Sequence, residues 1–223
     1  TLTSTDESAL LIGHRGVRSR GLENSLPAVR AAVENPALGL AGIEIDIHST
    51  SDGEIVLHHD PVTATGTVIA GATLAQLRAE GLPDGTQFPT LAEVLDAVAP
   101  LAVYVEAKGL APGADDALLE LLSSGRTPRK YAVHSFDHRI IKRLAVKAPG
   151  IRTGVLSSSY LIQPERQVLD AGAQVLWQHW ELVDAELVDR CRAHGIEVIA
   201  WTVPEVRVAE IAAMGVAGIC RDI

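Results

Sequence analysis

The apolar run GIEIDI at residues 42–47 carries two carboxylates where a buried strand would ordinarily be apolar. Because side chains alternate along a strand, Glu44 and Asp46 point to one side and the isoleucines around them point to the other, toward covering helices. Two like charges are thereby forced together. Such a pair is costly unless a bound cation, raised pKa values or basic neighbours offset it.

A third carboxylate lies in a second run of the same kind, AVYVEAK. Glu106 stands near the end of this expected strand, and Lys108, two residues on, points the same way. With Glu44 and Asp46 it would form a set of oxygen ligands, which suits a hard cation such as Mg²⁺ or Ca²⁺ rather than Zn²⁺. The alternative is a set of structural ion pairs in which Lys108 and Arg15 neutralise the carboxylates.

Two adjacent histidines end the strand-like stretch DGEIVLHHDP at residues 52–61. His58 and His59 point to opposite faces, so only one of them can face a site, and spacing alone does not select between them. Histidine transfers protons near neutral pH. Two histidines with a metal ion and a cationic anchor would form a site that cleaves phosphodiesters.

A further histidine follows the first apolar run, in LLIGHRG at residues 10–16. If this strand ends at a catalytic mouth, His14 can serve the reacting oxygen while Arg15 grips a phosphate oxygen. Gly16 would then permit close approach of the backbone to a ligand. The alternative for a His-Arg pair at a strand end is a surface cap.

Strand and helix patterns alternate along the chain, and this alternation predicts repeated β/α units. The expected strands are residues 9–13, 42–47, 102–107, 131–135, 152–157, 174–179, 197–201 and 216–220. The expected helices between them include residues 26–34, 91–99, 138–147, 185–194 and 204–214. Eight such strands predict an α/β fold, a (β/α)8 TIM barrel with its chemistry at the C-terminal ends of the strands. A doubly wound open sheet is the rival, but no GxGxxG glycine pattern follows the first strand.

One connection is too long and too rich in Gly and Pro for an ordinary loop. Residues 52–89 follow the second strand, and we expect them to form a small insertion over the active-site mouth.

Composition limits the class of protein. A chain of 223 residues with 47% hydrophobic content can bury one large core, so residues 1–223 are expected to form a single domain. No run is long and apolar enough for a membrane span, and the first ten residues lack the pattern of a signal peptide. The net charge of −9 argues against nucleic acid as a partner and favours a small substrate. Two cysteines, Cys191 and Cys220, fit reduced thiols and a cytoplasmic location.

Together these motifs resemble the glycerophosphodiester phosphodiesterase family of the (β/α)8 phosphodiesterase superfamily, over nearly the whole chain. The matching motifs, in order, are HRG at 14–16, ENS at 23–25, ExD at 44–46, TSDG at 50–53, HDP at 59–61, TLAEVL at 90–95, ExK at 106–108, SF at 135–136 and WTV at 201–203. The HDP match selects His59 over His58. Each motif is weak alone, and their order and spacing make the resemblance specific.

The resemblance implies roles for individual residues. It makes Glu44, Asp46 and Glu106 ligands of one divalent cation, and it makes His14 and His59 the acid/base pair. It also implies that Arg15 and Lys108 contact the phosphate.

Trp201 stands at the end of the expected seventh strand. It either walls the glycerol side of the pocket or packs in the barrel core.

Two late residues depart from the family pattern. Pro204 stands where WTVN is usual, and Arg221 precedes Asp222 where a TD dipeptide is usual. Arg221 would either bind a second anionic group of the substrate or form a surface salt bridge.

The implied activity is metal-dependent hydrolysis of glycerophosphodiesters to glycerol 3-phosphate and an alcohol, by a monomer or homodimer without stable membrane insertion. One alternative is a lysophospholipase D or sphingomyelinase-D-like enzyme, which would need an apolar groove in residues 60–90. Another is a catalytically silent barrel that binds phosphodiesters.

Overall fold

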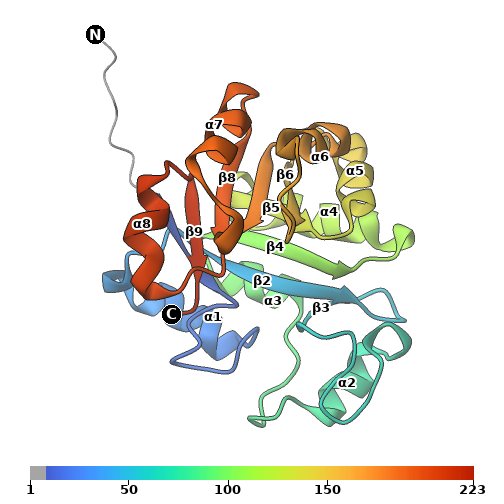
Figure 1. The fold of residues 1–223 in the computed structure, drawn as a ribbon. Helices are drawn as coiled ribbons and strands as arrows, with labels where there is room; N and C mark the ends of the chain where they lie inside the picture. Colours follow the sequence, from blue (N-terminus) through green and yellow to red (C-terminus); the bar gives the residue numbers. More distant parts are fainter. Residues whose placement is uncertain (1–8) are drawn as a thin grey trace.

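Eight of the nine strands run parallel and close into a barrel in the computed structural model, which describes residues 9–223 (Figure 1). The first eight residues, part of the N-terminal segment considered above, lie outside the described range. The strands are β1 (Leu10–His14), β2 (Gly42–Ser49), β3 (Ile55–Leu57), β4 (Ala102–Gly109), β5 (Tyr131–Ser135), β6 (Arg152–Ser157), β7 (Val175–His179), β8 (Glu197–Trp201) and β9 (Gly218–Arg221). The barrel is closed because β1 pairs with both β2 and β9, which confirms the predicted TIM barrel.

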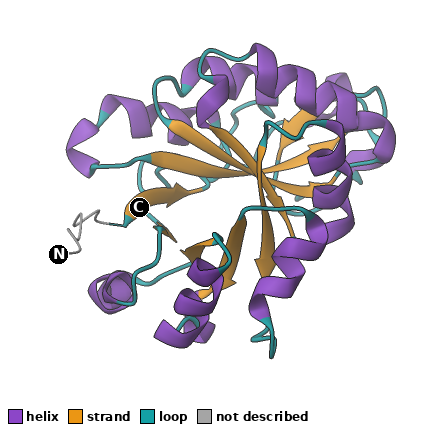
Figure 2. Ribbon diagram, turned by 90° about the horizontal axis from the view of Figure 1, so that it is seen from above, coloured by secondary structure: helices purple, strands orange, loops and turns teal. Residues whose placement is uncertain are grey.

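Helices surround the strands, as the view from above shows (Figure 2). They are α1 (Leu26–Glu34), α2 (Leu74–Glu80), α3 (Leu91–Ala97), α4 (Asp115–Ser124), α5 (His138–Lys147), α6 (Pro164–Ala171), α7 (Ala185–Ala193) and α8 (Val208–Ala213). The expected helix at 204–214 is shorter, because residues 205–207 form a separate 3-10 turn before α8. The helices α2, α4 and α6 were not among those that the sequence pattern predicted.

Polar residues start several of these helices and so set where each β/α loop ends. Ser25 caps α1, and Asp137 and Asp184 cap α5 and α7 through side-chain oxygens that accept backbone N–H groups. Thr90 and Glu93 form a reciprocal capping box at α3.

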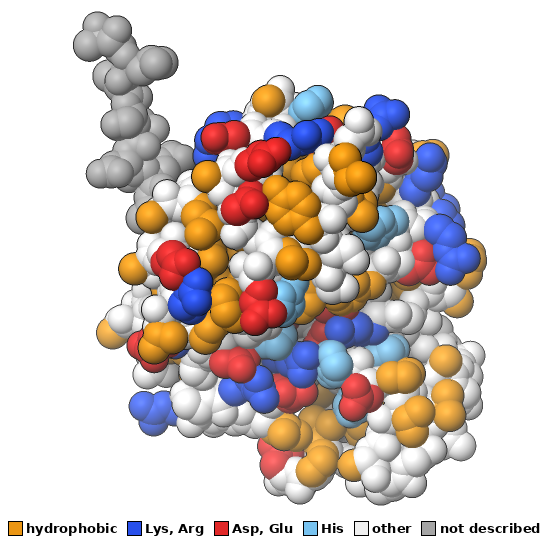
Figure 3. All heavy atoms as spheres, in the orientation of Figure 1, with side chains coloured by type: hydrophobic (Ala, Val, Ile, Leu, Met, Phe, Trp, Pro, Cys, Tyr) orange, Lys and Arg blue, Asp and Glu red, His pale blue; other side chains and the backbone are white. Residues whose placement is uncertain are grey.

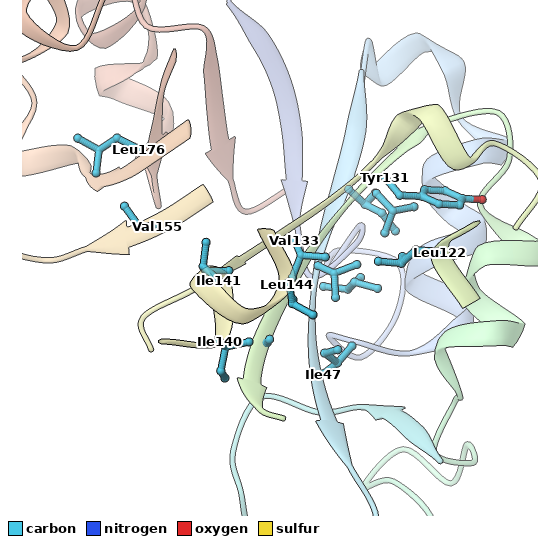
Figure 4. Packing of buried hydrophobic residues seen from close by; sticks show 14 of the residues in the cluster. Ile47, Leu122, Tyr131, Val133, Ile140, Ile141, Leu144, Val155 and Leu176 are labelled. Atoms are coloured by element: carbon cyan, nitrogen blue, oxygen red, sulfur yellow. The ribbon is translucent and has the colours of Figure 1, made fainter. Parts of the chain in front are cut away.

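The main core lies between the strands and the helices. Side chains that face outward from β5, β6 and β7, such as Val133, Val155 and Leu176, are buried in it together with Ile141 and Leu144 of α5 (Figure 4). Burial of each such side chain stabilises the fold by about 1.5–3 kcal/mol.

The predicted insertion follows β2 and has a small core of its own. β3 pairs antiparallel with the C-terminal end of β2, and α2 lies beyond it, at the lower right of Figure 1. The buried apolar side chains of this unit are Val56, Ile69, Ala72, Leu77, Leu82 and Phe88. Because β3 is bonded to the end of β2, the insertion lies at the rim where β2 delivers its last side chains.

No helix within residues 9–223 is long and apolar enough to cross a membrane. Cys191 and Cys220 are both free and buried, as the prediction of reduced thiols requires. That residues 1–223 form a single domain stays a prediction.

Candidate active site

The inside of the barrel changes character along its axis. Its lower part is apolar and is filled by Ile12, Tyr104, Ala132, Leu156, Val175, Trp177, Ile199 and Cys220. Above these, near the C-terminal ends of the strands, the inward side chains of β1, β2, β4 and β5 are charged or imidazole groups. On the surface, histidine, basic and acidic side chains gather just above the insertion (Figure 3).

Strand register brings the predicted site residues together. His14 of β1 pairs with Glu44 of β2, and Asp46 pairs with Glu106 of β4. Glu106 pairs in turn with His134 of β5, a residue that the sequence analysis did not single out. One ligand atom from each of Glu44, Glu106 and His134 lies within 4.8 Å of the others.

Glu44 and Glu106 are buried carboxylates whose charge the protein alone does not fully offset. Burial, followed by the charges of Asp46 and Glu106, raises the pKa of Glu44 well above its ordinary value. Burial and the charge of Asp46 raise the pKa of Glu106 to about 7, although Lys108 lies 2.7 Å away. Glu44 Oε1 has no hydrogen-bond partner among the described residues. A divalent cation would relieve both the repulsion and the missing contact, so these residues fit a metal site.

Asp46 has a different environment. Arg15 Nε lies 3.0 Å from its Oδ2, Lys108 Nζ lies 3.3 Å from its Oδ1, and Asn24 Nδ2 donates to Oδ2 at 2.8 Å. Burial alone would raise the pKa of Asp46, but Lys108 and Arg15 outweigh it and the pKa is lowered. The ion pairs considered above therefore exist, and they centre on Asp46 rather than on Glu44.

The loop after β1 places Arg15 by an unusual backbone. Arg15 has φ +59° and Gly16 has φ +86°, the left-handed region. A Cβ at Gly16 would lie 2.9 Å from the carbonyl carbon of Ala28 in α1, so this glycine permits close packing against a helix. That Gly16 also permits close approach of the backbone to a ligand stays a prediction. The Arg15 guanidinium is also bound by Glu23, at 2.7 Å from Nη1.

His14 is oriented by the last strand of the barrel. Its Nδ1 lies 2.8 Å from Asp222 Oδ1, just beyond β9, and its Nε2 lies 4.0 Å from Glu44 Oε2. Burial lowers the pKa of His14, and the hydrogen bond to Asp222 partly offsets this effect. The imidazole is therefore neutral at pH 7, with Nδ1–H donating to Asp222 and the Nε2 lone pair left to accept a proton.

His58 and His59 lie just beyond β3 and have different partners, although both line one pocket. The ring of His58 packs on Phe88 of the insertion core, with centroids 5.5 Å apart. His59 is partly exposed, and its Nδ1 lies 2.8 Å from Asp60 Oδ1. His48, buried at the end of β2, bonds the His59 carbonyl through Nε2 at 3.2 Å and so anchors this loop to the barrel.

A pocket of about 170 Å³ lies between this loop and the loop after β1. It is lined by Leu22, Glu23, Asn24, Leu57, His58, His59, Asp60, Leu82 and Pro83. Since Asn24 also bonds Asp46, the pocket borders the carboxylate cluster.

The opposite side of the mouth is aromatic. Trp201, half-buried at the end of β8, donates from Nε1 to the Trp177 carbonyl at 3.1 Å. Its ring meets Phe136 and His179 edge-to-face, with centroids 5.4 and 5.1 Å apart. Trp177 is fully buried inside the barrel, and the half-buried Trp201 packs against the same cluster, so both alternatives for Trp201 stay open.

The two late departures lie at the same rim. Arg221 Nη2 is 3.4 Å from Glu205 Oε2, which matches the salt-bridge alternative. Asp222, which keeps the aspartate of the usual TD dipeptide, binds His14. The sequence pattern gave no role to this aspartate.

Comparisons with known proteins agree on one family. A profile of the glycerophosphoryl diester phosphodiesterase family matches residues 14–223. The glycerophosphodiester phosphodiesterase of Caldanaerobacter subterraneus subsp. tengcongensis is 29% identical over 230 residues, which cover 96% of this chain and 93% of that protein.

Solved structures share the fold. The glycerophosphodiester phosphodiesterase of Thermotoga maritima has a TM-score of 0.79 and 25% identity, with 96% of this chain and 94% of that chain covered. An Oleispira antarctica phosphodiesterase, solved in complex with the product sn-glycerol-3-phosphate, has a TM-score of 0.84 and covers 96% of this chain and 93% of its own; at 21% identity it shows the fold alone. The chain belongs to the glycerophosphoryl diester phosphodiesterase family.

Proposed function

We propose that this chain hydrolyses glycerophosphodiesters to glycerol 3-phosphate and an alcohol, with a divalent cation and two histidines. The observation that carries the proposal is the buried pair of carboxylates, Glu44 and Glu106, beside the neutral imidazole of His14. Family membership supports the substrate class.

Glu44, Asp46 and Glu106 would hold the cation. When bound, the ion would act as a Lewis acid on a phosphate oxygen and offset the charge that develops as the P–O bond breaks. Oxygen ligands by themselves suit Mg²⁺ or Ca²⁺. The raised pKa values of Glu44 and Glu106 mean that protons compete with the ion for these two carboxylates.

His14 and His59 would exchange the two protons of the reaction, one activating the nucleophile and the other protonating the departing alcohol. Asp222 holds His14 in the tautomer whose Nε2 faces the carboxylates. Asp60 offers His59 a comparable partner at Nδ1.

Arg15 and Lys108 would bind the phosphate oxygens. Both side chains are largely buried, and both already pair with Asp46, so their charges are held at the site before substrate arrives. Burial opposes the charge of Lys108, but Asp46 and Glu106 outweigh this effect and raise its pKa. Trp201 would wall the glycerol side of the mouth.

The test is a panel of glycerophosphodiesters incubated with purified protein, with and without EDTA, in which glycerol 3-phosphate is measured. We expect release only when a divalent ion is present, and no release from Glu44→Gln at ion concentrations that saturate the wild type. Equal turnover in EDTA would overturn the metal requirement.

The same panel should include lysophospholipids. The core side chains of the insertion pack on one another and are at most 7% exposed, and its exposed valines, Val62 and Val68, do not line the pocket beside the carboxylates. The insertion therefore gives no reason to favour a lipid substrate. We further propose that the protein is cytoplasmic and is a monomer or homodimer. Light scattering on the purified protein measures its oligomeric state.

A further inference from the structure

We propose that His134 supplies a nitrogen ligand to the cation held by Glu44 and Glu106, and that this nitrogen makes the site prefer first-row transition ions such as Mn²⁺ to Mg²⁺ and Ca²⁺. The inference rests on the proposed function, which puts a divalent cation at these carboxylates. It goes further by adding a ligand and by naming the class of ion.

His134 is a polar side chain without a polar partner. It is 1% exposed, and its Nδ1 is a buried nitrogen without a hydrogen-bond partner within residues 9–223. Glu44 Oε1 lies 3.8 Å from its Nε2, and this oxygen also lacks a hydrogen-bond partner within the described residues. Buried polar atoms are nearly always paired, because an unpaired one costs about 1–3 kcal/mol. An ion between His134 Nε2 and Glu44 Oε1 would give this buried oxygen a partner.

The separation of these two atoms suits an ion better than a proton. At 3.8 Å the His134 Nε2 and Glu44 Oε1 atoms are too far apart for a hydrogen bond. Two ligand atoms that each lie about 2.1 Å from one ion can be up to about 4.2 Å apart. The Glu106 carboxylate belongs to the same cluster, in which the three ligand atoms lie within 4.8 Å of one another.

Packing fixes the direction of the His134 ring. It stacks on the Trp177 indole with centroids 4.0 Å apart and planes 7° from parallel. Gly154 belongs to β6, which lies between the strand of His134, β5, and the strand of Trp177, β7. A Cβ at Gly154 would be 2.9 Å from Trp177 Cδ1. The missing side chain therefore lets the indole lie across β6 and support the imidazole with its Nε2 toward Glu44.

Ligand type then sets ion preference. Mg²⁺ and Ca²⁺ take oxygen ligands, whereas an imidazole nitrogen binds transition ions more strongly. A site with two glutamates and one imidazole can still hold Mg²⁺ through its oxygens, but only transition ions gain from the nitrogen. If His134 were only an aromatic filler on Trp177, phenylalanine would serve equally well.

The experiment uses Mn²⁺ and Mg²⁺ as probes on chelator-treated protein. Mn²⁺ affinity is measured by the EPR signal of free Mn²⁺, and Mg²⁺ affinity by competition. We expect His134→Phe, which keeps the ring and the stack, to lower the preference for Mn²⁺ over Mg²⁺ by about tenfold. The matched control is His138→Phe on α5, whose Nε2 bonds the Leu156 carbonyl at 2.9 Å and which should leave the preference unchanged.

A direct readout needs no variant. Pulsed EPR of wild-type protein with bound Mn²⁺ should show ¹⁴N modulation from a coordinated imidazole, and its absence would overturn the inference. Glu44→Gln separates the two proposals. If it leaves Mn²⁺ binding unchanged, the metal site of the proposed function is wrong; if it abolishes binding while wild type shows no nitrogen coupling, only the role of His134 is wrong.

Discussion

Along β2, Ile43, Ile45 and Ile47 point outward into the helices, while Glu44 and Asp46 point into the barrel, and all five are at most 2% exposed. Each outward isoleucine stabilises the fold by burying apolar surface. Each inward carboxylate costs desolvation, and for Glu44 the protein supplies too little compensation. Burial alone thus fails to distinguish core from site, whereas the chemistry of each face does. One strand can serve stability on one side and catalysis on the other.

The largest effect should come from the inward side. We expect His14→Ala to lower kcat by roughly 10²- to 10⁴-fold, because the Nε2 lone pair beside Glu44 is lost. Thermal unfolding should change little. A loss below tenfold would show that His14 does not transfer a proton and would leave the inward face without its principal reactive group.

The outward side should give the opposite result. Ile45→Ala leaves a cavity beneath the helices and should lower the free energy of unfolding by about 2–5 kcal/mol. At a temperature where the variant is folded, its affinity for a divalent ion should be close to that of the wild type. Urea unfolding and metal titration on the same sample measure both quantities. If Ile45→Ala lost its affinity for the ion but kept the free energy of unfolding of the wild type, the assignment of the two faces of β2 would be wrong.

A pH series measures how much the inward carboxylates cost in free energy of unfolding. Glu106 has a folded pKa of about 7, above its ordinary value of 4.5, so the stability that its protonated form contributes is complete below about pH 4.5 and is lost as pH rises to about 7. In EDTA, the stability of wild type relative to Glu106→Gln should therefore fall on the order of 3 kcal/mol across this window. Urea unfolding at each pH measures the difference. A flat difference would mean that Glu106 is no more costly than a neutral side chain.

The smallest effect should come from a residue that acts through another. Asp222→Asn should lower kcat/KM by roughly ten- to a hundredfold, since His14 loses its orienting carboxylate. Because Asp222 raises the pKa of His14, the limb of the pH profile that reports His14 should move to lower pH. Arg18→Gln is the matched control, because Arg18 also pairs with Asp222 at 2.8 Å. An equal shift in both variants would indicate a general change in charge.

The strands were predictable because strands buried on both faces are continuous apolar runs, and the carboxylates stood out as interruptions of such runs. α6, with the short sequence PERQVLDA, has too few apolar positions for its periodicity to be distinctive. The choice of His59 over His58 came from the HDP motif and not from alternation. His58 packs on Phe88 of the insertion, but both histidines line the same pocket, so the choice of His59 stays a prediction.

Two site residues, His134 and Asp222, were not predicted from the sequence, for different reasons. His134 interrupts the apolar run YAVHS just as Glu106 interrupts its own strand, so the same rule would have found it. Asp222 carries no local sign of its role, because its partner His14 is 208 positions away and meets it only through the pairing of β1 with β9. The roles of the site residues stay predictions until the variants are measured.

The pairing of the first and last strands, β1 and β9, also determines when activity appears during folding. A half-formed barrel can hold the three acidic groups, which come from neighbouring strands, but the imidazole of His14 meets its carboxylate only when the ring of strands is complete. Turnover in a refolding experiment would therefore report ring closure, and it should recover after helical circular dichroism does.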